Sequence, residues 1–147
     1  MPEVSVSQVL DAPADAVWGL LADFGAIKRW WPDDGSAPIE TVEITGAGVG
    51  MIRHIQNRGA PSAVSERLDL LDPATRTIVL SIVGTRPMGI TAYVAEGRVL
   101  DAGPGRCRIE YRALVTTDPG REEQVRKALL KTWALMFRGL ESCARSA

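Results

Sequence analysis

The stretch "REEQVRKALLKTWALMFRGLESCARS" (residues 121–146) places apolar side chains at the spacing of one helix face. That face consists of Val125, Leu129, Trp133, Met136, Leu140 and Cys143. The pattern predicts a helix of about 24 residues, which is about 36 Å long at 1.5 Å per residue. An apolar helix face of this length must be buried against a second apolar surface, so the rest of the chain has to supply one.

The segment from Ile39 to Thr117 supplies that surface as a succession of strands and turns. Six strands are predicted: "IETVEIT" (39–45), "MIRHIQN" (51–57), "VSERLDLLD" (64–72), "TIVLSIV" (77–83), "ITAYVAEGRVL" (90–100) and "RCRIEYRALVTT" (106–117). Turn-forming residues separate most of these neighbours, which predicts antiparallel pairing of consecutive strands.

The N-terminal segment adds one strand and two short helices. "PEVSVSQVL" (2–10) alternates like a strand, and "DAPADAVWGLLADF" (11–24) changes to helical spacing with Pro13 near its start. Gly25 ends this helix, and "AIKRWWP" (26–32) predicts a second one that Pro32 stops. We therefore predict an α+β fold in a single domain, residues 1–147. Its seven-stranded antiparallel sheet is covered by the long C-terminal helix, and two short helices follow the first strand.

The composition excludes several classes of protein. Of the 147 residues, 46% are hydrophobic and 24% are charged, which is typical of a soluble globular domain. Seventeen basic and eighteen acidic residues leave a formal charge of −1, so no electrostatic footprint for nucleic acid is present. No apolar run approaches the roughly 18 residues of a membrane span, and the N-terminus lacks the features of a signal peptide. We expect a cytoplasmic protein that is a monomer or a homodimer.

No motif in the sequence predicts a metal or a cofactor. Cys107 and Cys143 lie far apart without C-x-x-C spacing, which favours two reduced thiols. The one histidine, His54, and two scattered cysteines form no recognisable ligand set, and no serine or aspartate is placed beside His54 by sequence. The glycines of "GAGVG" (46–50) precede a strand rather than a helix, so they fit a hairpin turn and not a phosphate-binding loop.

A carboxylate interrupts the apolar row of the strand at 64–72. Alternation places Val64, Glu66, Leu68 and Leu70 in that row. If the turn is centred near residues 59–60, residues whose numbers sum to about 119 face each other across the hairpin, which brings Arg53 opposite Glu66. The pair is then either a structural ion pair or a polar group in an apolar ligand cavity.

Further inward-facing residues suggest that the interior is incompletely filled. Tyr93 and Tyr111 fall in the apolar rows of the last two strands, and the small residues Ala95 and Gly97 follow Tyr93. We predict a cavity of roughly 300 Å³ or more between the helix at 120–144 and the sheet. The candidate ligand-binding residues are Arg53, Glu66, Tyr93, Tyr111, Trp30, Trp31, Trp133 and Met136.

The order of elements also resembles a known superfamily. "APADAVWGLLADFGAIKRWWP" (12–32), "GVGMIR" (48–53), "SERLDLLDPATR" (65–76) and the final helix resemble the START-like, or helix-grip, superfamily. This superfamily includes birch-pollen allergens, bacterial polyketide cyclase-like proteins and plant abscisic-acid receptors. The resemblance covers nearly the whole chain. It implies a sheet that grips the C-terminal helix around a hydrophobic cavity.

The resemblance also implies roles for particular residues. Glu66 matches the family glutamate that meets the ligand, usually through water, while Arg53 matches an arginine on the preceding strand and Tyr93 a cavity tyrosine. The loops at 58–62 and 84–89 match two loops at the cavity mouth. The receptor lysine that holds the hormone carboxylate would fall near Trp30 or Trp31, where no lysine stands, and the loop at 84–89 lacks the receptors' "HRL" sequence. A bacterial-type relative with a different ligand therefore fits better than a hormone receptor.

Three functions follow from these observations. The first is binding or carriage of a small hydrophobic molecule, with Glu66 and Arg53 orienting one polar group and no catalytic residue. The alternative is a polyketide cyclase-, aromatase- or dehydratase-like enzyme that uses Glu66 as general acid or base and Tyr93 as polariser. Because Arg53 favours the charged carboxylate, the pairing argues mildly for binding. The third is an interaction module with a filled core.

Overall fold

The computed structural model describes residues 2–35 and 37–146, and it has the predicted α+β architecture. In chain order the elements are β1 (Glu3–Leu10), α1 (Ala14–Ala22), the 3-10 helix η1 (Phe24–Arg29), β2 (Ile39–Thr45), β3 (Ile52–Asn57), β4 (Val64–Asp72), β5 (Thr77–Val83), β6 (Ile90–Asp101), β7 (Cys107–Thr117) and α2 (Glu122–Arg145). The predicted strands, the two short helices and the long C-terminal helix are all confirmed.

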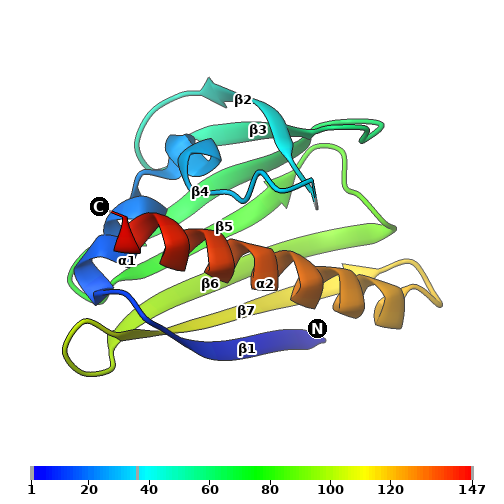
Figure 1. The fold of residues 1–147 in the computed structure, drawn as a ribbon. Coiled ribbons are helices and arrows are strands. Elements are labelled where there is room, and N and C mark those ends of the chain that lie inside the picture. The colour runs from blue at the N-terminus through cyan, green and yellow to red at the C-terminus, as the bar shows by residue number, and fades with distance from the viewer. Residues whose placement is uncertain (1, 36, 147) are drawn as a thin grey trace.

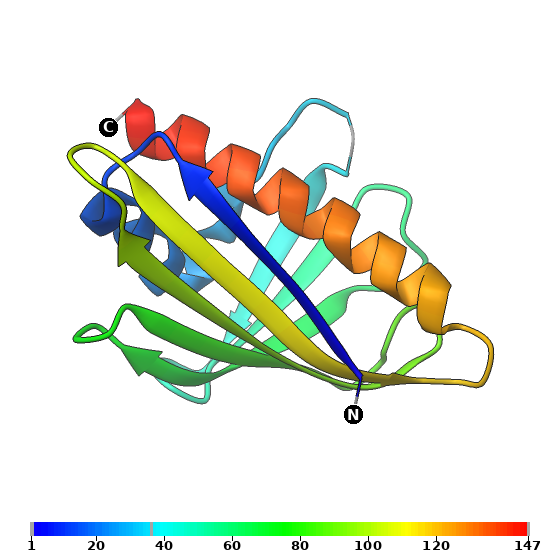
Figure 2. The ribbon, with the colours of Figure 1, turned by 90° about the horizontal axis from the view of Figure 1, so that it is seen from below.

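The seven strands form one antiparallel sheet in the order β1-β7-β6-β5-β4-β3-β2. The strands from β2 to β7 pair consecutively, as predicted, and β1 pairs with β7 at one edge. Figure 1 shows α2 crossing one face of this sheet, with α1 beside its C-terminal end. Seen from below, the strands curve beneath α2 (Figure 2). The core therefore lies between α2 and one face of the sheet.

The long helix buries the predicted face. Val125, Leu129, Trp133, Met136 and Leu140 are all buried, and Cys143 is half-buried. Glu122 and Glu123 occupy the first turn, where negative charge interacts favourably with the helix dipole. None of the helices that the structure describes is long and apolar enough to span a membrane.

The second short helix differs from the predicted one. It is a 3-10 helix that ends at Arg29, so Trp30 and Trp31 follow the helix and do not belong to it. The backbone N–H groups of both tryptophans donate to the Ile27 carbonyl, at 3.2 and 3.0 Å. α2 crosses this chain segment at Gly139, where an added Cβ would lie 2.1 Å from the Trp30 carbonyl oxygen. The bare backbone of Gly139 thus allows the close approach that positions both tryptophans.

The prediction for Leu70 was wrong because β4 contains a β-bulge. Leu68 pairs with Leu80, whereas Leu70 pairs with Val79, so the alternation shifts between them. Leu68 is 1% exposed on the inner face, and Leu70 is 43% exposed on the outer face. Leu71 packs against the core in its place. Glu66 precedes the bulge and keeps its inward direction.

Candidate functional site

Arg53 and Glu66 face each other across β3 and β4, which confirms the predicted register. Arg53 Nε donates to Glu66 Oε1 at 2.8 Å, and Arg53 Nη2 lies 2.8 Å from the same oxygen. The side chains are 8% and 17% exposed, respectively. The pair is therefore largely removed from water, where each charge depends on the other for compensation.

Arg53 is also fixed by Phe24. Its Nη1 donates to the Phe24 carbonyl at 3.0 Å, and its guanidinium carbon lies 3.9 Å from the centroid of the Phe24 ring. A guanidinium over an aromatic face gains a cation–π interaction in addition to packing. Since both Arg53 contacts to Glu66 end on Oε1, no residue in the described ranges makes a hydrogen bond to Oε2. The other carboxylate oxygen remains available.

A pocket of about 270 Å³ lies between α2 and the sheet, with this ion pair in its wall. Its volume is slightly below the predicted value of roughly 300 Å³. The apolar lining comes from Ile27, Trp31, Ala37, Ile55, Val64, Ile82, Pro87, Met88, Ile90, Leu129, Trp133 and Met136. The polar lining comes from Arg53, Asn57, Glu66, Tyr93, Tyr111 and Thr132. This combination of an apolar wall and a few convergent polar groups is typical of small-molecule sites.

Seven of the eight predicted site residues line this pocket, and Trp30 does not. Trp30 is buried, and among the described residues its indole Nε1 has no hydrogen-bond partner. Trp31 lines the pocket and donates its Nε1–H to the Ala37 carbonyl at 2.8 Å. Asn57 Nδ2 donates to the same carbonyl at 3.1 Å. Trp31 and Asn57 thus hold the 37–38 segment beside the pocket.

The two tyrosines provide neutral hydroxyl groups. Burial raises the pKa of Tyr93 well above its usual value, and the neighbouring Tyr111 and Glu66 raise it further. Burial, followed by the charge of Glu66, also raises the pKa of Tyr111. The Tyr111 ring meets the Trp133 ring edge to face, with centroids 4.9 Å apart. Both phenols therefore stay protonated at neutral pH and are able to donate hydrogen bonds.

The small residues of β6 do not form the pocket, contrary to the sequence argument. Gly97 pairs with Tyr111, and an added Cβ at Gly97 would lie 3.0 Å from Tyr111 Cδ2 and Cε2. The Tyr111 ring thus occupies the space that the missing side chain leaves. Neither Ala95 nor Gly97 lines the pocket, which lies beside Ile82 and Ile90.

The two loops matched to a cavity mouth contribute unequally. The loop at 84–89 provides Pro87 and Met88, whereas none of residues 58–62 lines the pocket. The Gly89 carbonyl accepts a hydrogen bond from Asp118 N–H at 2.8 Å, which connects the loop at 84–89 to the segment before α2. The family resemblance indicated the loop that holds Pro87 and Met88, whereas no periodicity or motif indicated Ala37.

Sequence reasoning missed the partners of His54. Its Nδ1 lies 2.7 Å from Ser65 Oγ, and its Nε2 lies 2.9 Å from Thr45 Oγ1. The register that pairs Arg53 with Glu66 also pairs His54 with Ser65, so the information was present in the sequence. His54 faces the opposite side of the sheet from Arg53. Thr45 stands where a carboxylate would orient the histidine in a Ser–His–Asp site, so this group is not such a triad.

The comparison with protein families agrees with this fold. The sequence model of Polyketide_cyc2, described as "Polyketide cyclase / dehydrase and lipid transport", matches residues 1–146. The chain belongs to this family. The resemblance to the START-like superfamily and its polyketide cyclase-like branch is therefore confirmed. No curated protein sequence matches this family member.

Solved structures share the fold at low sequence identity. A putative uncharacterized protein from Bacillus thuringiensis aligns with a TM-score of 0.82 and 19% identity, over 97% of this chain and 98% of that one. Norcoclaurine synthase from Thalictrum flavum aligns with a TM-score of 0.78 and 22% identity, over 99% and 87%. The di-domain ARO/CYC protein BexL from the BE-7585A biosynthetic pathway aligns with a TM-score of 0.81 and 21% identity, over 99% of this chain and 47% of BexL. These similarities establish the shared architecture.

Proposed function

We propose that this protein binds or carries a compact hydrophobic molecule in the pocket between α2 and the sheet. The observation that carries the proposal is Glu66 Oε2, a carboxylate oxygen without a hydrogen-bond partner among the described residues, in a mostly aromatic and aliphatic pocket. The Glu66 side chain is 17% exposed, so Oε2 is within reach of a molecule that enters the pocket. A bound molecule with a polar group would satisfy it.

A second candidate function is a cyclase-, aromatase- or dehydratase-like reaction in the same pocket. It is favoured by the family description and by the presence of Glu66 and Tyr93 in one pocket. In this function Glu66 would accept a proton from the substrate while the Tyr93 hydroxyl donates to a substrate carbonyl. Release of a modified product by the purified protein would distinguish catalysis from carriage.

Blocking the pocket from α2 tests the proposed function. Thr132 is exposed and lines the pocket, so Thr132→Trp is expected to fill the opening with little loss of stability. Lys131→Trp is the matched control, because Lys131 is an exposed neighbour on the same helix that does not line the pocket. Protein purified from its own host should carry a small molecule in native mass spectrometry, and Thr132→Trp alone should lose it. Equal occupancy in both variants would contradict a site in this pocket.

Ligand binding should also protect the loop at 84–89 from amide hydrogen exchange. Pro87 and Met88 contact the pocket, while Gly84 and Gly89 adopt positive φ angles at the two ends of the loop. A ligand that contacts these residues should reduce the local openings that exchange requires. Exchange mass spectrometry with and without the recovered ligand should show the slower exchange at 84–89. The turn at 73–76 lies outside the pocket lining and should not change.

A further inference from the structure

The polar end of the pocket is asymmetric in what it offers a ligand. Arg53 and Glu66 are the charged groups among the described residues that line the pocket. Arg53 uses Nε and Nη2 on Glu66 Oε1 and Nη1 on the Phe24 carbonyl, and the Phe24 ring packs against its guanidinium. All three guanidinium nitrogens of Arg53 therefore already contact protein acceptors. Glu66 Oε2, in contrast, has no hydrogen-bond partner among the described residues.

A carboxylate oxygen without a partner favours ligands whose polar group can donate a hydrogen bond, and it disfavours ligands whose polar group is negatively charged. A ligand hydroxyl donates to it and forms a charge-assisted hydrogen bond, which is stronger than a bond between neutral groups. A ligand carboxylate has no proton to donate at neutral pH, and it would place a second negative charge beside Glu66 without a new cation. The neutral Tyr93 and Tyr111 phenols add donors for a ligand oxygen but do not compensate a charge.

The size and lining of the pocket limit the rest of the ligand. An apolar cavity of about 150 Å³ takes one benzene molecule. A pocket of about 270 Å³ therefore has room for two fused rings. Trp31, Trp133 and the two tyrosines line it, and aromatic rings pack on such surfaces in edge-to-face or offset arrangements.

We infer that the pocket selects compact, neutral hydroxyaromatic molecules, whose hydroxyl donates to Glu66 Oε2, and rejects the corresponding carboxylates. This inference rests on the proposed function and specifies its ligand class. Arg53 acts as a positioning residue that holds Oε1 and leaves Oε2 directed to the ligand.

Three probes with the same ring system test the inference by isothermal titration calorimetry at about pH 7, where naphthoate is charged and naphthol is neutral. They are 2-naphthol, naphthalene and 2-naphthoate. The wild-type protein should bind 2-naphthol about tenfold more tightly than naphthalene, as expected for one hydrogen bond to a charged acceptor. It should bind 2-naphthoate more weakly than naphthalene.

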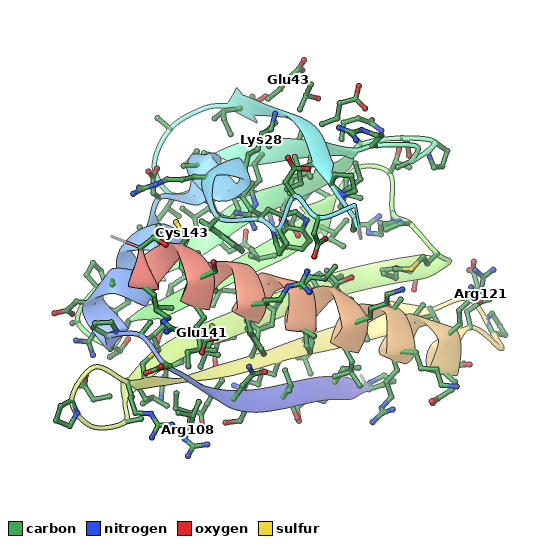
Figure 3. All side chains as sticks on the ribbon, in the orientation of Figure 1. Lys28, Glu43, Arg108, Arg121, Glu141 and Cys143 are labelled. Carbon is green, nitrogen blue, oxygen red and sulfur yellow. The ribbon has the colours of Figure 1, made fainter. Side chains whose placement is uncertain are left out.

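Glu66→Gln keeps the shape of the side chain and removes its charge. In this variant the advantage of 2-naphthol over naphthalene should shrink, and 2-naphthoate should become the tightest of the three because Arg53 then lacks its anion. Glu43→Gln is the matched control, since Figure 3 shows Glu43 extending from β2 away from the body of the protein. This control should retain the wild-type ranking. The wild-type ranking tests the inference even if Glu66→Gln folds poorly.

The outcomes separate the two proposals. If the probes bind, and Thr132→Trp abolishes their binding, but 2-naphthoate binds the wild type as tightly as 2-naphthol, the ligand class is wrong and the proposed function stands. If none of the probes binds, the ligand class is wrong, and the native mass spectrometry of Thr132→Trp decides the proposed function. If the probes bind and Thr132→Trp leaves both their binding and the retained host molecule unchanged, both proposals are overturned. A wild-type preference for 2-naphthol that survives in Glu66→Gln would also overturn the inference, because the hydroxyl must then donate elsewhere.

Discussion

Arg53→Ala is expected to lower the free energy of unfolding by about 3–5 kcal/mol, the usual range when one partner of a buried ion pair is removed. The change leaves the Glu66 carboxylate, which is 17% exposed, without its cation. It also leaves the Phe24 carbonyl without its donor and the Phe24 ring without the guanidinium that packs on it. Urea denaturation followed by tryptophan fluorescence measures the loss.

Arg112→Ala is the matched control for this prediction. Arg112 also contacts two carboxylates, those of Glu3 and Glu96, but its side chain is 58% exposed. Ion pairs in water contribute little, so this variant should lose at most about 1 kcal/mol. An Arg53→Ala variant as stable as Arg112→Ala would mean that Glu66 is effectively solvated.

The double variant Arg53→Met with Glu66→Leu separates stability from binding. It should recover most of the lost stability, because apolar residues of similar size often replace a buried ion pair without loss. It should nevertheless lose the preference for 2-naphthol over naphthalene, since no charged acceptor remains. A double-mutant cycle on both quantities gives the coupling energy of the pair. A double variant that keeps the preference would assign Arg53 and Glu66 a purely structural role.

Gly139→Ala is expected to destabilise the protein by about 1–3 kcal/mol or more, the cost of inserting a methyl group where no space exists. The new Cβ would lie 2.1 Å from the Trp30 carbonyl oxygen and 2.9 Å from Pro32 Cδ. Because the first of these atoms belongs to the backbone, α2 and the chain after η1 have to move apart. Thermal unfolding and the tryptophan emission maximum should both shift, since Trp30 and Trp31 lie at this contact.

The opposite sign is expected for Gly19→Ala in α1. An added Cβ at Gly19 meets no atom within 4 Å, so the substitution gains helix propensity without a clash. It should stabilise the protein by about 0.5–1 kcal/mol. If Gly139→Ala were as stabilising as Gly19→Ala, the close crossing of α2 over Trp30 would be disproved.

The ion pair could be predicted from the sequence because strand alternation and the turn after β3 both depend on residues close together in the chain. Strand alternation has a period of two residues, so it placed Glu66 inward from its neighbours alone. The short turn after β3 set the register, which placed Arg53 opposite Glu66. The same register also pairs His54 with Ser65, so this contact follows from the same turn.

The sequence was insufficient wherever a distant segment decides the outcome. Trp30 and Trp31 are adjacent and chemically identical, yet Trp31 lines the pocket and Trp30, whose carbonyl meets α2 at Gly139, does not. The space beside Gly97 is filled by Tyr111 from the neighbouring strand. The absence of a side chain at Gly97 therefore did not predict a cavity there. The bulge in β4 likewise turns Leu70 outward, and β4 contains no glycine or proline that would have predicted the bulge.

The sequence by itself determined the order of elements, the apolar face of α2 and the inward pairing of Arg53 with Glu66, because periodicity and a short turn are properties of neighbouring residues. The tertiary structure alone decided the volume of the pocket, its lining by Ala37 and the availability of Glu66 Oε2. These features depend on how closely α2, the loops and the sheet approach one another. That approach is set by packing between residues that are far apart in the chain, which no local pattern records.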